Sequence, residues 1–272
     1  MQSAVLPLRP LTLGELLDAG VALLRRHAAV LLLAGAVLAV AEQVVLWPLR
    51  QLAGTGAPWY PPDGDRLGAY WLLIAAGLGT EAAAIALAGG LAARAAGPDL
   101  LGTRLPSRRL AAPKGSRAGS VVVAAALTAP VVAISALALL VPWIFGYGLT
   151  GLTVPAVVID GYGPGGALLR SIVLSARNGM RAMWVRVSGY LGWLAIRCAL
   201  AYGGAGVLFL FFGDTAWLPW AAVAIATAVN AVAYPALACL DAVLHLETRI
   251  RTEALDIWLS RRPDAQLLRV KP

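Results

Sequence analysis

Four polar residues lie inside long apolar segments, where water does not reach them. Glu42, Glu81, Arg197 and Asn230 each lie within a predominantly apolar run. A charged side chain at the centre of a lipid bilayer costs at least about 2.5–3.5 kcal/mol if it has no partner. We therefore expect Arg197 to pair with Glu81 or Glu42, and all four residues to form one buried polar cluster.

Such a cluster supports two kinds of role. It can hold a proton, an ion or a polar substrate on a path through the membrane. It can also be a structural ion pair that fixes helix packing, because interhelical polar contacts are common in membrane bundles. The residue types leave both roles open.

The usual catalytic and metal-binding patterns are missing from the sequence. His27 and His245 are the only histidines, and Cys198 and Cys239 lie in apolar runs without CxxC spacing. Walker A, GxSxG and HExxH motifs do not occur. Metal-assisted phosphodiester hydrolysis would need clustered carboxylates and histidines. We expect no catalytic residues, no metal site, no cofactor and no enzyme activity.

The elements that position these residues are predicted to be membrane-spanning helices. Of the 272 residues 60% are hydrophobic and 13% charged, and the mean hydropathy is +0.76. A span needs about 20 apolar residues, and six segments qualify within a membrane domain over 28–246. We predict an all-α bundle, with a hairpin broken at Pro142 because proline interrupts the helical hydrogen bonds. The six segments are 28–49, 69–93, 119–140, 143–160, 187–211 and 219–245.

The positions of the basic residues predict how the chain crosses the membrane. Nineteen of the 22 lysines and arginines precede the first segment, follow the last, or lie between the second and third or the fourth and fifth. Such residues stay on the cytoplasmic side. We expect a multi-pass protein of the inner (plasma) membrane with both termini cytoplasmic. The net charge of +8 then indicates contact with anionic lipids and not nucleic acid.

Three amphipathic segments are predicted on this cytoplasmic side: a helix within 1–27, an interfacial helix over 164–180, and a C-terminal helix and tail over 247–272. Thr12 and Glu15 have the spacing of a capping box. In each segment the apolar residues lie on one face of the helix and most charged residues lie on the other. This pattern indicates helices that lie flat in the membrane interface. Their charges are candidates for partner or lipid contacts: Glu15, Asp18, Arg170, Arg177, Glu247, Arg249, Arg251, Glu253 and Asp256.

The third segment has internal charge pairs. Glu247 and Arg251, like Arg249 and Glu253, stand four residues apart, so each pair lies on one face of a helix. Exposed pairs of this kind contribute only about 0.3–0.5 kcal/mol each. The acidic residues could instead face the basic Arg170 and Arg177 segment or a partner protein.

The stretches "RPLTLGELLDAGVALLRRH", "ALLRSIVLSARNG" and "ETRIRTEALDI" resemble signatures of the actinobacterial membrane proteins named for the glycerophosphoryl diester phosphodiesterase membrane domain. Arg249, Arg251, Glu253 and Asp256 match the family pattern, whereas Glu247 replaces a more usual Asp. The resemblance covers the membrane part and implies no catalytic domain. It also implies a membrane-protein or MoxR-type AAA ATPase partner, by association only.

Two functions are therefore expected from the sequence. The first is a non-enzymatic membrane scaffold, or a subunit of a membrane assembly, whose cytoplasmic helices dock a partner or organise lipid. The second is a small transporter or channel that uses the buried polar cluster.

Overall fold

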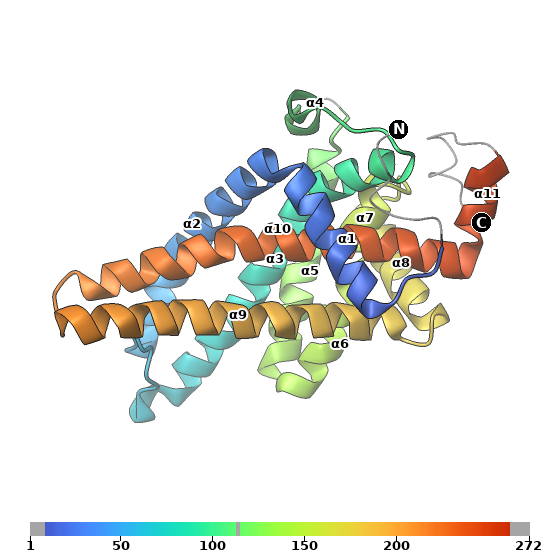
Figure 1. Ribbon diagram of the computed structural model, residues 1–272. Helices are drawn as coiled ribbons and strands as arrows, with labels where there is room; N and C mark the ends of the chain where they lie inside the picture. Colours follow the sequence, from blue (N-terminus) through green and yellow to red (C-terminus); the bar gives the residue numbers. More distant parts are fainter. Residues whose placement is uncertain (1–8, 113–114, 262–272) are drawn as a thin grey trace.

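The computed structural model describes residues 9–112 and 115–261. The chain is 83% helical, and no strand occurs in the described ranges, which confirms the predicted all-α bundle. Six helical segments are long and apolar enough to cross a membrane. Figure 1 shows α1, α8 and α11 at one end of the bundle, which we call the terminal end because the described part of the chain begins and ends there. The turn between α9 and α10 lies at the opposite end.

Four of the spanning helices, α2, α3, α9 and α10, are longer than the predicted segments. A short 3-10 turn, η1 (Gly64–Arg66), precedes the second of them. The fourth span is divided between two shorter helices that Gly151 and Leu152 separate. In chain order the helices are α2 (Ala28–Ala53), α3 (Leu67–Leu100), α5 (Ala118–Leu137), α6 (Leu140–Thr150) with α7 (Thr153–Val158), α9 (Arg181–Phe212) and α10 (Leu218–Glu253).

Helix α10 is the central element of the bundle. It packs against α1, α2, α3 and α9, and every residue from Ala233 to Ile250 is buried. A helix that is buried all round cannot expose a polar stripe to water. The polar residues of this half must therefore find partners inside the protein.

The predicted break at Pro142 is wrong. Helix α5 ends at Leu137, and the chain turns at Ala138 and Leu139. Leu139 adopts a φ of 89°, outside the helical region. Pro142 lies in the first turn of α6, where its missing N–H breaks no helical hydrogen bond.

Helix α1 (Leu13–Arg26) has the predicted capping box, with both Thr12–Glu15 hydrogen bonds formed. Part of its apolar face packs on the protein, whereas Leu13 and Val21 remain exposed. Leu16 and Leu23 are buried. Gly20 sits so close to α10 that an added Cβ would lie 3.3 Å from the backbone of Leu240. The absence of a side chain at Gly20 therefore permits α1 to dock on α10.

The remaining helices lie near the terminal end. They are α4 (Ser107–Ala111), α8 (Pro164–Arg177) and α11 (Leu255–Arg261). On α8, Leu169, Ile172 and Val173 are exposed, which suits a helix in the membrane interface. Helix α10 runs through the predicted domain boundary at 246/247 and continues to Glu253, before Ala254 ends it with a φ of 52°. Residues 262–272 of the predicted tail lie outside the described residues.

Candidate functional site

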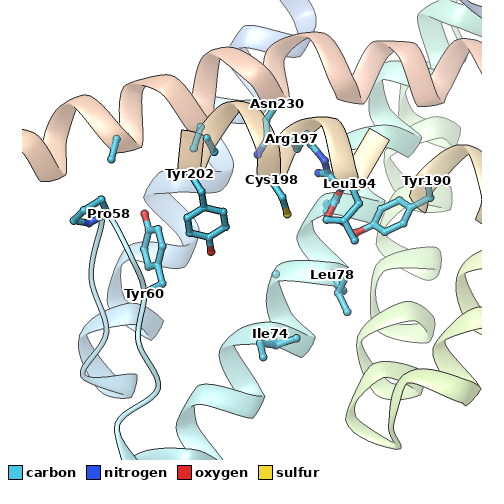
Figure 2. Close-up of a pocket in the computed structure, with 15 residues that line it drawn as sticks. Pro58, Tyr60, Ile74, Leu78, Tyr190, Leu194, Arg197, Cys198, Tyr202 and Asn230 are labelled. Carbon is cyan, nitrogen blue, oxygen red and sulfur yellow. Dashed lines mark hydrogen bonds and ion pairs between the residues drawn. The ribbon is translucent and has the colours of Figure 1, made fainter. Parts of the chain in front are cut away.

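A cavity of about 330 Å³ opens between α3, α9 and α10. Figure 2 shows Ile74 and Leu78 on one wall and Leu194, Arg197 and Cys198 on another. Most of the wall is apolar, but Glu81, Tyr190 and Asn230 also line it. An apolar pocket with a few convergent polar groups is the usual form of a small-molecule site.

Glu81 and Arg197 form a buried ion pair on the wall of this cavity. Arg197 Nη1 donates to Glu81 Oε1, and the Tyr190 hydroxyl donates to Glu81 Oε2 at 2.9 Å. Only 8% of the surface of either charged residue is exposed. Both residues lie near the middle of their helices. The pair therefore places two opposite charges deep between α3 and α9.

The guanidinium of Arg197 is only partly used by this pair. Its Nε and Nη2 atoms are buried and have no hydrogen-bond partner among the described residues. These two nitrogens form one edge of the guanidinium plane, the fork that binds carboxylate or phosphate with two parallel hydrogen bonds. Leaving buried charged donors unsatisfied is costly. Arg197 thus retains a two-donor edge that an anionic group would satisfy.

Glu42 forms a second polar site beside the first. The Tyr234 hydroxyl donates to Glu42 Oε2, Thr80 Oγ1 donates to Oε1 at 3.3 Å, and Asn230 Nδ2 lies 3.5 Å from Oε2. All three partners are neutral. Within residues 9–112 and 115–261, no ion pair involves Glu42, although only 7% of its surface is exposed.

The four residues predicted to form a cluster therefore divide into two neighbouring groups. Arg197 pairs with Glu81 and not with Glu42. Asn230 bonds the Tyr234 hydroxyl at 2.8 Å and also lines the cavity. Asn230 is thus the residue that connects the Glu42 group to the cavity.

A smaller cavity of about 190 Å³ lies toward the opposite end of the bundle. Trp47 and Trp220 stack on its wall with their ring centroids 5.8 Å apart. The Arg50 guanidinium lies 5.3 Å from the centroid of the Tyr60 ring. Tyr60 lines both this cavity and the larger one. Its ring therefore separates two adjacent spaces.

Aromatic rings close the larger cavity toward the terminal end. The Tyr190 ring contacts Tyr147 and Trp143, with centroids 4.7 Å and 5.1 Å away. Beyond them the Arg186 guanidinium lies over Tyr147 at 3.8 Å, and Arg186 Nε donates to Asp241 Oδ1 at 2.8 Å. This second ion pair is also buried.

A larger ion-pair network fills the terminal end. Arg249 Nη1 and Nε donate to Asp160 and Glu253, each at 2.9 Å. Arg170 forms salt bridges with the same two acids, and His245 Nε2 lies 3.0 Å from Asp160 Oδ1. Burial raises the pKa of Asp160, but the charges of His245, Arg249 and Arg170 outweigh burial and hold that pKa below its usual value.

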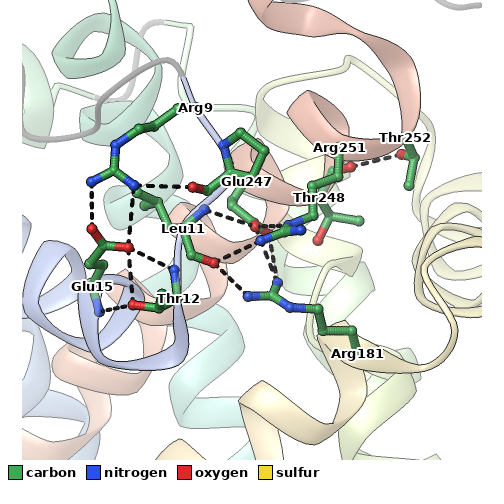
Figure 3. Close-up of polar contacts among 10 residues, drawn as sticks. Arg9, Leu11, Thr12, Glu15, Arg181, Glu247, Thr248, Arg251 and Thr252 are labelled. Carbon is green, nitrogen blue, oxygen red and sulfur yellow. Dashed lines mark hydrogen bonds and ion pairs between the residues drawn. The ribbon is translucent and has the colours of Figure 1, made fainter.

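Glu247 joins the N-terminal segment to α9 and α10 (Figure 3). Its side chain is fully buried and pairs with Arg251 and, at 3.0 Å, with Arg181. Both arginines also donate to the carbonyl oxygen of Leu11, at 2.7 Å from Arg181 and 2.9 Å from Arg251. The predicted pairs Glu247–Arg251 and Arg249–Glu253 are thus formed. The side chains of Glu247, Arg249 and Glu253 are buried, whereas Arg251 remains partly exposed.

The other predicted interaction residues have different surroundings. Glu15 pairs with Arg9 at 2.5 Å, and hydrogen bonds from Arg9 and Thr12 lower the pKa of Glu15 to about 2. Asp18 and Arg177 are exposed, and Asp256 is half-buried in the first turn of α11. Asp18, Arg177 and Asp256 form no ion pair among the described residues and are at least partly exposed to solvent or lipid. The other six predicted interaction residues form ion pairs within the protein.

Several polar contacts were not predicted. Asp241 lies inside the predicted span 219–245. The energetic cost of an unpaired charge in the bilayer, from which we predicted a partner for Arg197, therefore also predicts a partner for Asp241. Asp160 is the last residue of the predicted span 143–160, and Arg186 was assigned to a loop although it is buried within α9. Tyr190 and Tyr234 carry no local signal, because aromatic residues are ordinary in apolar helices.

The described residues contain no group of histidine, cysteine or acidic residues that could hold a metal ion. The geometry instead supports binding of a polar group in the cavity and buried charge pairing around it. Comparisons with protein-family models, with curated proteins and with solved structures find no match to this chain.

Proposed function

We propose that this membrane protein binds and transports a small anionic or amphiphilic molecule in the cavity between α3, α9 and α10. The observation that carries the proposal is the unsatisfied Nε–Nη2 edge of Arg197 beside a cavity of about 330 Å³. A carboxylate or phosphate would complete this edge, and the apolar wall would accept the rest of the molecule.

A purely structural role accounts for less of this arrangement. An ion pair that only fixed helix packing would need Glu81 and one donor of Arg197. It would not need an open cavity or two further buried donors. The second cavity shares Tyr60 with the first and lies between it and the end of the bundle opposite the terminal end.

The scaffold function is our second candidate. It is supported by exposed apolar residues of α8, and not by the charged residues that the sequence suggested. Glu247, Arg249, Glu253 and Arg170 bind one another or neighbouring helices, so they are occupied within the chain. The exposed Leu169, Ile172 and Val173 of α8 support contact of the terminal end with lipid, for which basic residues favour anionic headgroups.

Several related expectations remain proposals. They are membership of the glycerophosphoryl diester phosphodiesterase membrane domain family, the absence of enzyme activity, and an AAA ATPase or membrane-protein partner. The cavity proposal depends on none of them, because it rests on the surroundings of Arg197.

Cys198 offers a direct test of whether the cavity holds water. It lines the cavity and is exposed, whereas Cys239 is buried. We expect a charged thiol reagent to label the wild-type protein in membranes and to leave Cys198→Ser unlabelled. Labelling by an apolar reagent alone would mean that the cavity opens only to lipid, and the transport of a polar molecule would be excluded.

Ligand binding is tested by the thermal stability of the purified protein. We expect inorganic phosphate, a dicarboxylate or a short-chain anionic lipid to raise the melting temperature, because a ligand that binds the folded state stabilises it. Arg197→Lys keeps the charge but lacks the fork, so it should lose the shift. Arg66→Lys, at an exposed position, is the control. If no probe stabilises wild type more than Arg197→Lys, the binding proposal fails.

A further inference from the structure

The Glu42 site differs from every other buried carboxylate described above, because Glu42 forms no ion pair with any of the described residues. Its hydrogen-bond partners come from two neighbouring helices: α3 contributes Thr80, and α10 contributes Asn230 and Tyr234. The nearest charges are Glu81 and Arg197, which already neutralise each other.

We infer that Glu42 is a proton-binding site that exchanges its proton with water in the cavity. An isolated carboxylate in a low-dielectric interior is unfavourable, and such a group takes up a proton instead. The Tyr234 hydroxyl donates to Glu42, and the Tyr190 hydroxyl donates to Glu81.

The hydrogen bonds around Glu42 suit both protonation states. Thr80 Oγ1 lies 3.3 Å from Glu42 Oε1 and 3.0 Å from the Gly77 carbonyl oxygen. When Glu42 is ionised, Thr80 donates to it. When Oε1 carries a proton, Thr80 donates to Gly77 and accepts from the carboxyl group. One hydroxyl rotation therefore satisfies either state without moving a helix.

The cavity supplies the route for the proton. Asn230 bonds the Tyr234 hydroxyl, and Asn230 also lines the cavity wall. Water that enters from the cavity past the Asn230 side chain accepts the proton released by Glu42 directly, and the carboxylate that remains accepts from Tyr234, Thr80 and Asn230. This step rests on the proposed function only in requiring that water enters the cavity.

Infrared difference spectroscopy of the reconstituted protein tests the inference without any ligand. A protonated carboxyl group gives a C=O band that a carboxylate lacks. We expect wild type to show one such band that Glu42→Gln loses, and that shifts when water is replaced by D2O. Glu15→Gln, which removes an exposed carboxylate at the terminal end, should keep the band.

Tyr234→Phe is a second variant that keeps the carboxyl group in place. Because it removes a hydrogen bond to Glu42, the band should move to higher frequency. Identical spectra for wild type and Glu42→Gln at every pH would overturn the inference, as would a Glu42 band unaffected by D2O. Cys198 labelling reports water in the cavity independently, so failure of this site and failure of the proposed function are distinguishable.

Discussion

At the scale of single residues, the buried charges divide into those that satisfy one another and those that do not. Asp241 is matched by Arg186, and Asp160 by Arg249, His245 and Arg170. Two donor atoms of Arg197, Nε and Nη2, have no hydrogen-bond partner among the described residues, and Glu42 forms no ion pair with any of them. Matched pairs suit a structural role. Arg197 lines the cavity, and Glu42 is connected to the cavity wall through Asn230. This contrast is our reason for locating function there.

The Arg186–Asp241 pair should behave as a structural element. Asp241→Asn leaves Arg186 buried without a counter-charge, so we expect a loss of about 3–5 kcal/mol of stability. Replacing both partners, with Arg186→Met and Asp241→Leu, should recover most of that loss because no buried charge remains. Thermal unfolding in detergent measures both. A double variant as unstable as the single one would show that the pair is needed for more than charge balance.

At the scale of elements, hydrogen bonds to the backbone of Leu11 join the start of α1 to α10 and α9. Glu247 on α10 accepts from the Leu11 backbone N–H at 3.4 Å, and Arg181 and Arg251 bind the Leu11 carbonyl. The capping box at Thr12 begins α1 immediately after this contact. The start of α1 is thus held by its own cap and by α9 and α10 together.

Thr12→Ala should therefore loosen α1. Loss of an N-cap side chain typically costs about 0.5–2 kcal/mol, and Thr12→Ser, which keeps the hydroxyl, should cost little. Protection of α1 from limited proteolysis, together with thermal unfolding, measures the effect. Equal protection in the alanine and serine variants would mean that the α10 contacts alone hold α1 in place.

At the scale of the whole molecule, six candidate spans return the chain to the side on which it starts. We expect both termini on the cytoplasmic side, because the arginine-rich segments gather at the terminal end. Reporter proteins that fluoresce only in the cytoplasm should be active when fused to either terminus. They should be dark when inserted in the 54–63 loop at the opposite end. Activity of the loop insertion would contradict this orientation.

The sequence predicted local features well where one strong physical rule dominated. Apolar length located the spans, and the Thr12–Glu15 spacing located the start of α1. The break after α5 was misplaced because Pro142 was read as a helix breaker, although proline is tolerated in a first turn. The continuation of α10 to Glu253 was not predicted, because a rise in charge was read as exposure.

Long-range contacts decided what the local pattern could not. Glu81 and Arg197 are 116 positions apart, and Glu42 and Tyr234 are 192 apart. No periodicity relates such positions, so the sequence required a partner for Arg197 without choosing between Glu42 and Glu81. The spacing of the charged residues in 247–256 likewise predicted the pairs Glu247–Arg251 and Arg249–Glu253. Only packing around α10 determined that the side chains of Glu247, Arg249 and Glu253 are buried.

The sequence by itself determined that this chain forms apolar helices long enough to span a membrane and that charges within them need partners. Both follow from the cost of exposing backbone and charge to lipid, which each segment meets alone. The tertiary structure decided that Glu81 receives the arginine, that Glu42 has only neutral partners, and that a cavity lies beside both. These outcomes depend on how helices distant in the chain pack together.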